Sequence, residues 1–180
     1  SLLGWVDTDR VPQAFRLSDA VEVPAGAYGH RGVDLSLRTP AGASVSLDSL
    51  VSTGRLYDAP FLMLRASPKW HVSSSLELSG LYEHTRIGFA GDGARFRAHL
   101  ARLRALLMFD TRLSLGSFVQ YSSLSGSLSA NVRLRYNRAE GVDLYVVYND
   151  FLAVGRVARR GGAEESRTIL VKYVHTFNFR

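Results

Sequence analysis

The chain has no cysteine, only two lysines and no long apolar run. Without cysteine it can form no disulfide, and it offers neither a thiol nucleophile nor a thiolate ligand for zinc. The longest apolar stretch covers residues 59–64, whereas a membrane-spanning helix needs about 20 apolar residues. We therefore expect no transmembrane helix. No secretory signal opens the chain, which begins at Ser1, so we expect a mature or truncated segment.

The 180 residues include 22 basic and 16 acidic side chains, and 46% of them are hydrophobic. This composition is too apolar for a disordered chain, and the length fits one domain or a piece of one. Because Lys69 and Lys172 are the lysines, arginine supplies the other 20 basic residues. Arginine binds phosphate well, but these arginines occupy alternate strand positions without aromatics on the same face. We therefore expect no nucleic-acid partner.

Apolar and polar residues alternate with a period of two along most of the chain, which predicts β-strands. The clearest segment is 128–136, where Val132 and Leu134 occupy one set of alternate positions, the apolar parity. Arg133 and Arg135 occupy the other set, the polar parity. The same alternation marks 33–38, 45–48, 70–82, 112–121, 142–149 and 167–179.

Three segments are less clear. Residues 96–109 can be drawn as a helix or as a strand, and we predict a strand because strands of matching length lie on both sides. Residues 55–66 are a weak strand because Pro60 removes a hydrogen-bond donor. Residues 1–14 are expected to be irregular, and residues 15–23 are a candidate tenth strand.

The predicted connections alternate in length. Residues 39–43, 67–69, 110–111 and 137–141 form short turns, and residues 85–95 and 150–166 form long loops, with 52–55 and 122–127 as shorter members of the second set. Short turns at one end and longer loops at the other are typical of outer-membrane β-barrels.

Aromatic residues of the apolar parity fall near the predicted strand ends. Trp70, Phe109, Tyr136, Phe177 and Phe179 are assigned to one rim, and Tyr82, Tyr121 and Tyr148 to the other. A single tilted strand from Trp70 to Tyr82 would cover about 28 Å of the membrane normal, close to the apolar band of about 25 Å between the aromatic girdles of a barrel.

The opposite parity is expected to face a polar lumen. Its charged members are Glu77, Arg102, Arg104, Arg133, Arg135, Asp143 and Lys172. We expect the arginines to pair with Glu77, Asp143 or Asp34. In the last long loop, Arg156, Arg159 and Arg160 could meet lipopolysaccharide phosphates, or could simply be solvated.

No catalytic, metal or cofactor site is expected. The five histidines are isolated and form no metal-ligand pair, and no G-x-S-x-G motif occurs. Residues 88–93 have the glycine spacing of a phosphate loop, but Ala94 and Arg95 follow in place of Lys-Ser/Thr. A flexible loop is therefore the expected structure there.

The segment from Arg112 to Asp150 resembles a C-terminal β-barrel domain of unknown function. That domain occurs in bacterial proteins with an N-terminal family-nine-like carbohydrate-binding domain. The matching residues are 112–114, 118–121, 131–136, 141–149 and 167–179, with weaker matches at 21–28 and 55–59. The resemblance implies an outer-membrane barrel linked to carbohydrate through a domain absent from this sequence. The family supplies no catalytic residues.

The predicted fold is an all-β, antiparallel, up-and-down transmembrane β-barrel of about ten strands, or the C-terminal part of a larger one, in a single domain over 1–180. The predicted function is a bacterial outer-membrane anchor or porin-like pore, with the lipid bilayer as partner. One alternative is a soluble antiparallel β-sandwich or lipocalin-like binding module, in which the apolar parity would face an interior. A second alternative is a membrane-embedded hydrolase.

Overall fold

The computed structural model describes residues 1–18, 21–40, 42–89, 95–154 and 165–176. These residues form β-strands joined by turns and no helix. The strands are β1 (Leu2–Val11), β2 (Phe15–Ser18), β3 (Val21–Val23), β4 (Gly26–Arg38), β5 (Val45–Leu56), β6 (Ala59–His71), β7 (Leu76–Gly88), β8 (Arg95–Met108), β9 (Leu113–Ser122), β10 (Ser127–Ala139), β11 (Val142–Ala153) and β12 (Ser166–His175). The all-β prediction is confirmed.

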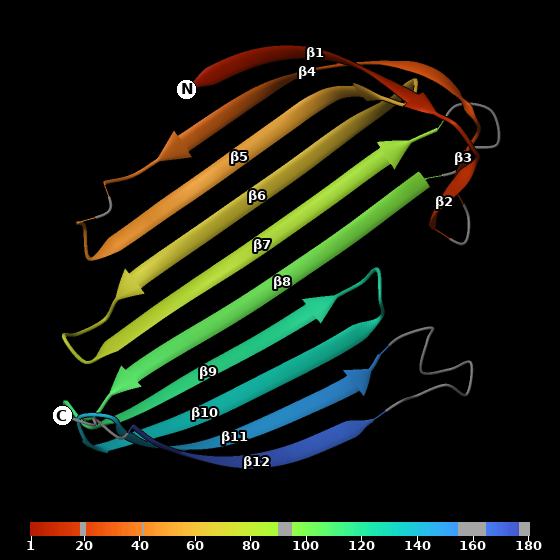
Figure 1. The fold of residues 1–180 in the computed structure, drawn as a ribbon. Helices are drawn as coiled ribbons and strands as arrows, with labels where there is room; N and C mark the ends of the chain where they lie inside the picture. Colours follow the sequence, from red (N-terminus) through yellow and green to blue (C-terminus); the bar gives the residue numbers. More distant parts are fainter. Residues whose placement is uncertain (19–20, 41, 90–94, 155–164, 177–180) are drawn as a thin grey trace. The chain divides into compact units, whose positions relative to one another are not determined.

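Ten strands form one sheet in the order β1-β4-β5-β6-β7-β8-β9-β10-β11-β12, so nearly every strand pairs with its neighbour in sequence (Figure 1). The pairs β1–β4, β4–β5, β9–β10, β10–β11 and β11–β12 are all antiparallel. The ends of this order are β1 and β12, and within the described part of the chain no pairing joins them. The sheet is therefore open at two edges, each a strand of 10 residues.

The chain divides into two compact units. Unit 1 comprises Ser1–Pro68 and Leu81–Leu100, and unit 2 comprises Lys69–Gly80 and Ala101–Arg180. In unit 1, the turn 57–58, the end of β7 and the start of β8 lie at one end, and the end of β4 and the start of β5 lie at the other. In unit 2, residues 72–75, 109–112 and 140–141 form one end, and residues 123–126, the end of β11 and the start of β12 lie at the other.

Each unit has an apolar and a polar sheet face, because directly paired residues project to the same side. In unit 2, one row across four strands consists of Leu115, Leu134, Val146 and Val171. The adjacent row on the same side is Leu113, Tyr136, Leu144 and Tyr173. We call this side the apolar face of unit 2 and the other its polar face.

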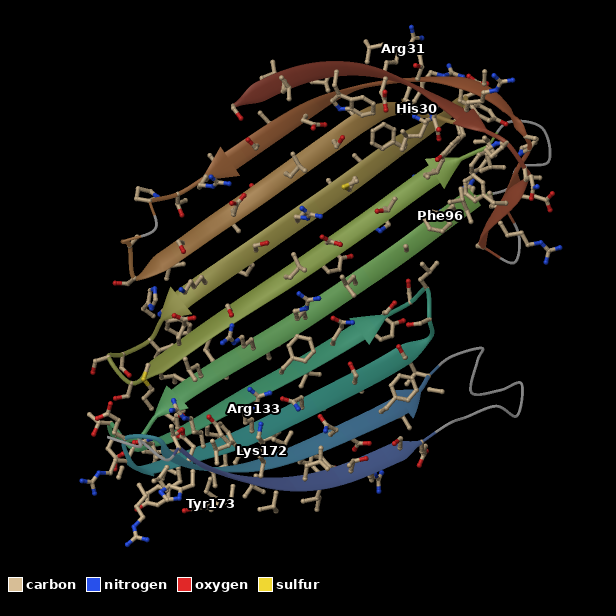
Figure 2. The ribbon with its side chains drawn as sticks, in the orientation of Figure 1. His30, Arg31, Phe96, Arg133, Lys172 and Tyr173 are labelled. Carbon is tan, nitrogen blue, oxygen red and sulfur yellow. The ribbon has the colours of Figure 1, made fainter. Side chains whose placement is uncertain are left out.

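Unit 1 shows the same division. Leu2, Leu35 and Val51 form one row of its apolar face, and Leu3, Asp34 and Ser52 form the neighbouring row on its polar face. Figure 2 shows Arg31 and His30 on opposite sides of β4, as the alternation requires. The period-two pattern read from the sequence therefore has a direct structural counterpart.

The small β2–β3 sheet packs on the polar face of unit 1. Val21 of β3 is 3% exposed and lies in a buried cluster with Ala59, Phe61, Ile87 and Phe96. The ring centroid of Phe61 lies 6.0 Å from that of Trp5, whose indole Nε1 donates to Asp34 Oδ1 at 2.9 Å. This cluster is therefore on the polar side of the sheet, and no buried cluster is seen on the apolar side of the described strands.

Several predicted boundaries are wrong. Residues 2–11 form β1, although 1–14 were expected to be irregular. Of the candidate strand 15–23, residues 15–18 and 21–23 form the separate β2–β3 sheet, so they do not supply a strand of the large sheet. β1 was missed because Leu3 and Trp5 lie on the polar face, where the indole bonds a carboxylate, and Arg10 lies on the apolar face. These residues break the alternation.

Two predicted turns are also wrong. Residues 67–69 lie inside β6, and the chain reverses at 72–75 instead, where Ser73 Oγ accepts hydrogen bonds from the backbone N–H groups of Ser75 and Leu76. Residues 52–55 lie inside β5, and the reversal occurs at Tyr57 and Asp58, both with positive φ. The prediction of a longer loop at this connection is therefore wrong, because the chain reverses in a tight turn. The strand prediction for 96–109 is confirmed by β8.

Candidate functional site: the cationic face of unit 2

Charged side chains from three strands gather on the polar face of unit 2. Arg135, Tyr145 and Lys172 form one row across β10, β11 and β12, and Arg133, Val147 and Leu170 form the next row. Figure 2 shows Arg133 and Lys172 on the same side of these strands, and Tyr173 on the other side of β12. β8 contributes Arg102 and Arg104 to this unit.

Arg135 and Asp143 form an ion pair, as the sequence predicted. Arg135 Nε donates to Asp143 Oδ1 at 2.9 Å, and Asn137 Nδ2 donates to the same oxygen at 3.0 Å. The guanidinium carbon of Arg135 also lies 5.9 Å from the centre of the Tyr145 ring. The charge of Arg135 is therefore compensated, and its position is fixed by Asp143 and Tyr145.

The other predicted ion pairs of this face are wrong. Arg102 donates from Nε and Nη2 to Gln120 Oε1, at 3.1 and 2.9 Å, and its guanidinium lies 5.4 Å from the centre of the Phe118 ring. Glu77 instead binds Lys69 Nζ at 3.0 Å and lies 3.4 Å from His71 Nδ1. These partners are neighbours across a hairpin, whereas the sequence gives no register between distant strands.

Asp34 belongs to unit 1, and no arginine that the structure describes bonds to it. Its Oδ1 accepts from Trp5 Nε1 at 2.9 Å and from Ser52 Oγ at 2.5 Å. The carboxylate is therefore held by neutral donors, and the arginines of unit 2 have to find compensation elsewhere.

A groove of about 350 Å³ lies between Arg133 and Lys172. Its other lining residues are Tyr145, Val147, Leu170 and Val174. Neither cation forms an ion pair with any residue that the structure describes. Two uncompensated cations beside aliphatic side chains can attract a small anion and accommodate an apolar part of it.

Only some of the aromatic residues predicted for the two rims lie at strand ends. Phe109 lies in the turn 109–112, Tyr121 is next to the last residue of β9, and Tyr136 lies in the row that also contains Tyr173. Tyr148 lies within β11, where its hydroxyl donates to Asp150 Oδ2 at 2.9 Å. Phe177 and Phe179 lie outside the described residues, as do Arg156, Arg159 and Arg160.

Trp70 and Tyr82 do not delimit one strand. Trp70 is next to the last residue of β6, whereas Tyr82 lies in the middle of β7. The strand predicted from 70 to 82 is therefore wrong, since the chain reverses between these residues. The sequence did not single out Tyr145 or Tyr173 as site residues, and it did not predict the groove. The alternation of 167–179 nevertheless placed Tyr173 on the same parity as Val171.

The histidines are not all isolated. The ring centroids of His84 and His99 lie 4.4 Å apart, and the Tyr82 hydroxyl lies 3.0 Å from His99 Nδ1. His30 is 6% exposed and packs edge-on against Tyr57 at 4.8 Å. Among the residues that the structure describes, no group of three His, Asp or Glu side chains is placed to hold a metal ion.

No family model, curated protein or solved structure matches the chain. In the described part of the chain, no helix has the length and apolarity needed to cross a bilayer. Function therefore has to be inferred from the chemistry of the two sheet faces.

Proposed function

We propose that this protein is a transmembrane β-barrel of the bacterial outer membrane, with its apolar face against lipid tails and its polar face lining a wet lumen. The observation that carries this proposal is that the apolar face of each unit is uncovered. Val6 is 82% exposed, Leu35 is 55% exposed and Val171 is 68% exposed. Large contiguous apolar surfaces of this kind are rare on soluble proteins and mark a surface with a missing partner.

Strand length supports a membrane as that partner. The strands of the large sheet contain 10 to 14 residues, and a tilted strand needs about 9–11 residues to cross a bilayer. Strands of soluble proteins most often have about 5–6 residues. Every strand of the large sheet is therefore long enough to span the hydrocarbon layer.

The proposal requires that the two open edges be paired in the membrane. Each unsatisfied backbone group in hydrocarbon costs several kcal/mol, so only closed barrels and helices span bilayers. The edge strands β1 and β12 each expose a row of such groups. We propose that the sheet closes, either by pairing of these strands with each other or through further strands between them.

A soluble sandwich is the weaker alternative. It would require a second layer on the apolar face. The second sheet seen among the described strands is β2–β3, and its Val21 packs with Phe61 and Phe96 on the polar side. The side that a sandwich must bury is therefore the side that is left bare.

The uncompensated cations favour a pore over a purely mechanical anchor. A wall that only held an attached module would gain nothing from unpaired charges, whereas Arg133 and Lys172 raise the local concentration of anions. We propose an anion-attracting lumen. The connection to carbohydrate remains an expectation from the family resemblance alone.

Gel mobility and vesicle insertion test the proposal. A closed barrel should migrate differently on SDS gels before and after boiling, should require detergent to stay in solution, and should produce conductance when added to lipid bilayers. A soluble protein with heat-independent mobility would contradict the barrel. Insertion without conductance would leave the barrel in place and favour the anchor over the pore.

A further inference from the structure

One end of the apolar face of unit 1 carries a band of arginines. We call this set the arginine belt; its members are Arg10, Arg31, Arg55, Arg86, Arg95 and Arg97. Arg55 lies two residues before the turn at 57–58, and Arg86 and Arg95 flank the connection 89–94. The belt therefore lies at the end of unit 1 where these connections are found, next to the aliphatic rows of the same face.

Among the described strand residues of unit 1, no acidic residue lies on the same face as the belt. The acidic residues on the strands of the large sheet in unit 1 are Asp7, Asp9, Asp34, Asp48 and Glu83, and all have the polar-face parity. Within the described ranges no belt arginine forms an ion pair. Arg55 does donate from Nη2 to the backbone carbonyl of Asp58 at 2.7 Å.

The belt brings like charges directly together. Arg31 and Arg55 are paired across β4 and β5. The contact between His84 and His99 implies that Arg86 and Arg97, two residues further toward the connection 89–94, also face each other on antiparallel strands. Like charges at opposed positions destabilise a sheet, unless an anion lies between them.

Grooves with apolar floors adjoin these arginines. One of about 530 Å³ is lined by Arg31 and Arg55 together with Gly4, Val6 and Val33. A smaller one of about 200 Å³ places Arg86 beside Pro60 and Leu62. Guanidinium groups bind phosphate oxygens in bidentate fashion, and an apolar floor next to them suits an acyl chain.

We propose that the arginine belt binds the phosphate groups of a phosphorylated, multiply acylated membrane lipid, with its acyl chains along the aliphatic rows. The proposal rests on the proposed function, because it requires the apolar face to meet lipid. It also fixes the orientation of unit 1: the end with the turn 57–58 lies at the bilayer surface that carries this lipid, which in an outer membrane is the external one.

Lipid retention by paired variants tests the proposal. The full chain is inserted into vesicles containing bisphosphorylated lipid A, extracted in mild detergent, and analysed by native mass spectrometry for bound lipid. The double variant Arg31→Gln/Arg55→Gln should lose roughly tenfold in retention. The matched control Arg133→Gln/Lys172→Gln removes the same charge from the polar face of unit 2 and should retain lipid A like the parent.

Three comparisons decide the outcome. Dephosphorylated lipid A should be retained roughly tenfold less by the parent protein, and inorganic phosphate alone should not displace bound lipid A. Equal retention of both lipids, equal loss in both double variants, or displacement by inorganic phosphate would overturn the belt as a lipid site. Failure of the parent protein to enter vesicles would instead contradict the barrel itself.

Discussion

At the turn between β5 and β6, two ordinary residues adopt the left-handed conformation. Tyr57 and Asp58 have φ values of 52° and 58°, which two-residue hairpins require and which Asn-Gly normally supplies. Tyr57 is retained for its contacts, since its ring meets His30 at 4.8 Å, Tyr28 at 5.4 Å and Phe15 at 5.8 Å. Burial, followed by the nearby Asp9 and Tyr28, raises the pKa of the Tyr57 phenol.

Asp58→Gly should therefore stabilise the protein by about 0.5–1 kcal/mol, because glycine adopts this conformation without the steric cost that other residues have. Tyr57→Gly should destabilise it, because the lost aromatic contacts outweigh the same relief. Urea unfolding of the vesicle-inserted protein measures both. A loss of stability in Asp58→Gly would show that the aspartate side chain contributes more than its backbone strain.

The turn between β8 and β9 depends on ionisation. The carboxylate of Asp110 accepts hydrogen bonds from the backbone N–H groups of Arg112 and Leu113, both at 2.7 Å. These bonds, followed by the charge of Arg112, lower the pKa of Asp110. Because the pKa is lower in the folded state, the contribution to stability is present above the ordinary aspartate value of about 3.9 and is lost as pH falls through the folded value.

Asp110→Ala should consequently be less stable than the parent protein at pH 7, and the difference should shrink as pH falls below about 4. Unfolding by urea at a series of pH values measures this. The control is Asp48→Ala. It removes a carboxylate outside this turn, whose Oδ2 lies 2.8 Å from Arg38 Nε on the polar face. If the difference in unfolding free energy between Asp110→Ala and the parent protein persists at low pH, then the Asp110 side chain stabilises the turn even when it is protonated.

At the scale of single strands, alternation alone predicted which residues share a face. The row of Leu115, Leu134, Val146 and Val171 and the pair of Arg135 and Asp143 follow from period-two parity. Parity does not determine where a strand ends, because Ser52–Gly54 and Pro68 resemble turn residues but lie within β5 and β6. The turn at Tyr57 and Asp58 carries no glycine or asparagine to mark it.

The candidate site was less predictable than the strands. Which arginine meets which partner depends on register and hairpin geometry, so Arg102 was assigned a carboxylate and instead bonds the Gln120 amide. The groove between Arg133 and Lys172 depends on β10, β11 and β12 lying side by side. Sequence spacing across the connection 154–165 could not supply that arrangement.

Introducing a charge at the centre of the apolar face tests the face assignment. Leu134→Arg lies in the all-aliphatic row, and an arginine facing lipid near the bilayer midplane costs about 2–4 kcal/mol. Thr168→Arg on the polar side of β12 should cost much less, because it would face water. Urea unfolding in vesicles compares the two. Equal costs would contradict the assignment of the apolar face to lipid.

At the scale of the molecule, charge is sorted by face and by unit. In unit 1 the carboxylates of the large sheet lie on the polar face and the arginine belt lies on the apolar face. In unit 2 the apolar face carries the ion pair of Asp150 and Arg167, 3.5 Å apart, while Arg133 and Lys172 lie unpaired on the polar face. The two groups of unpaired cations therefore lie on different faces, the belt on the face that we propose meets lipid and Arg133 and Lys172 on the face that we propose lines the lumen.

This separation predicts that ion selectivity and lipid binding respond to different residues. If the sheet closes as proposed, the parent protein should prefer anions, because the polar face of unit 2 carries the unpaired cations Arg133 and Lys172. Arg133→Glu/Lys172→Glu should lower the permeability ratio of chloride to potassium by roughly threefold or more, whereas Arg31→Gln/Arg55→Gln should leave it unchanged. Reversal potentials across bilayers in a potassium chloride gradient measure the ratio. If the belt variant shifts selectivity as strongly as the groove variant, then the face containing Arg31 and Arg55 lines the water-filled path, and the lipid-facing and lumen-facing sides have been assigned the wrong way round.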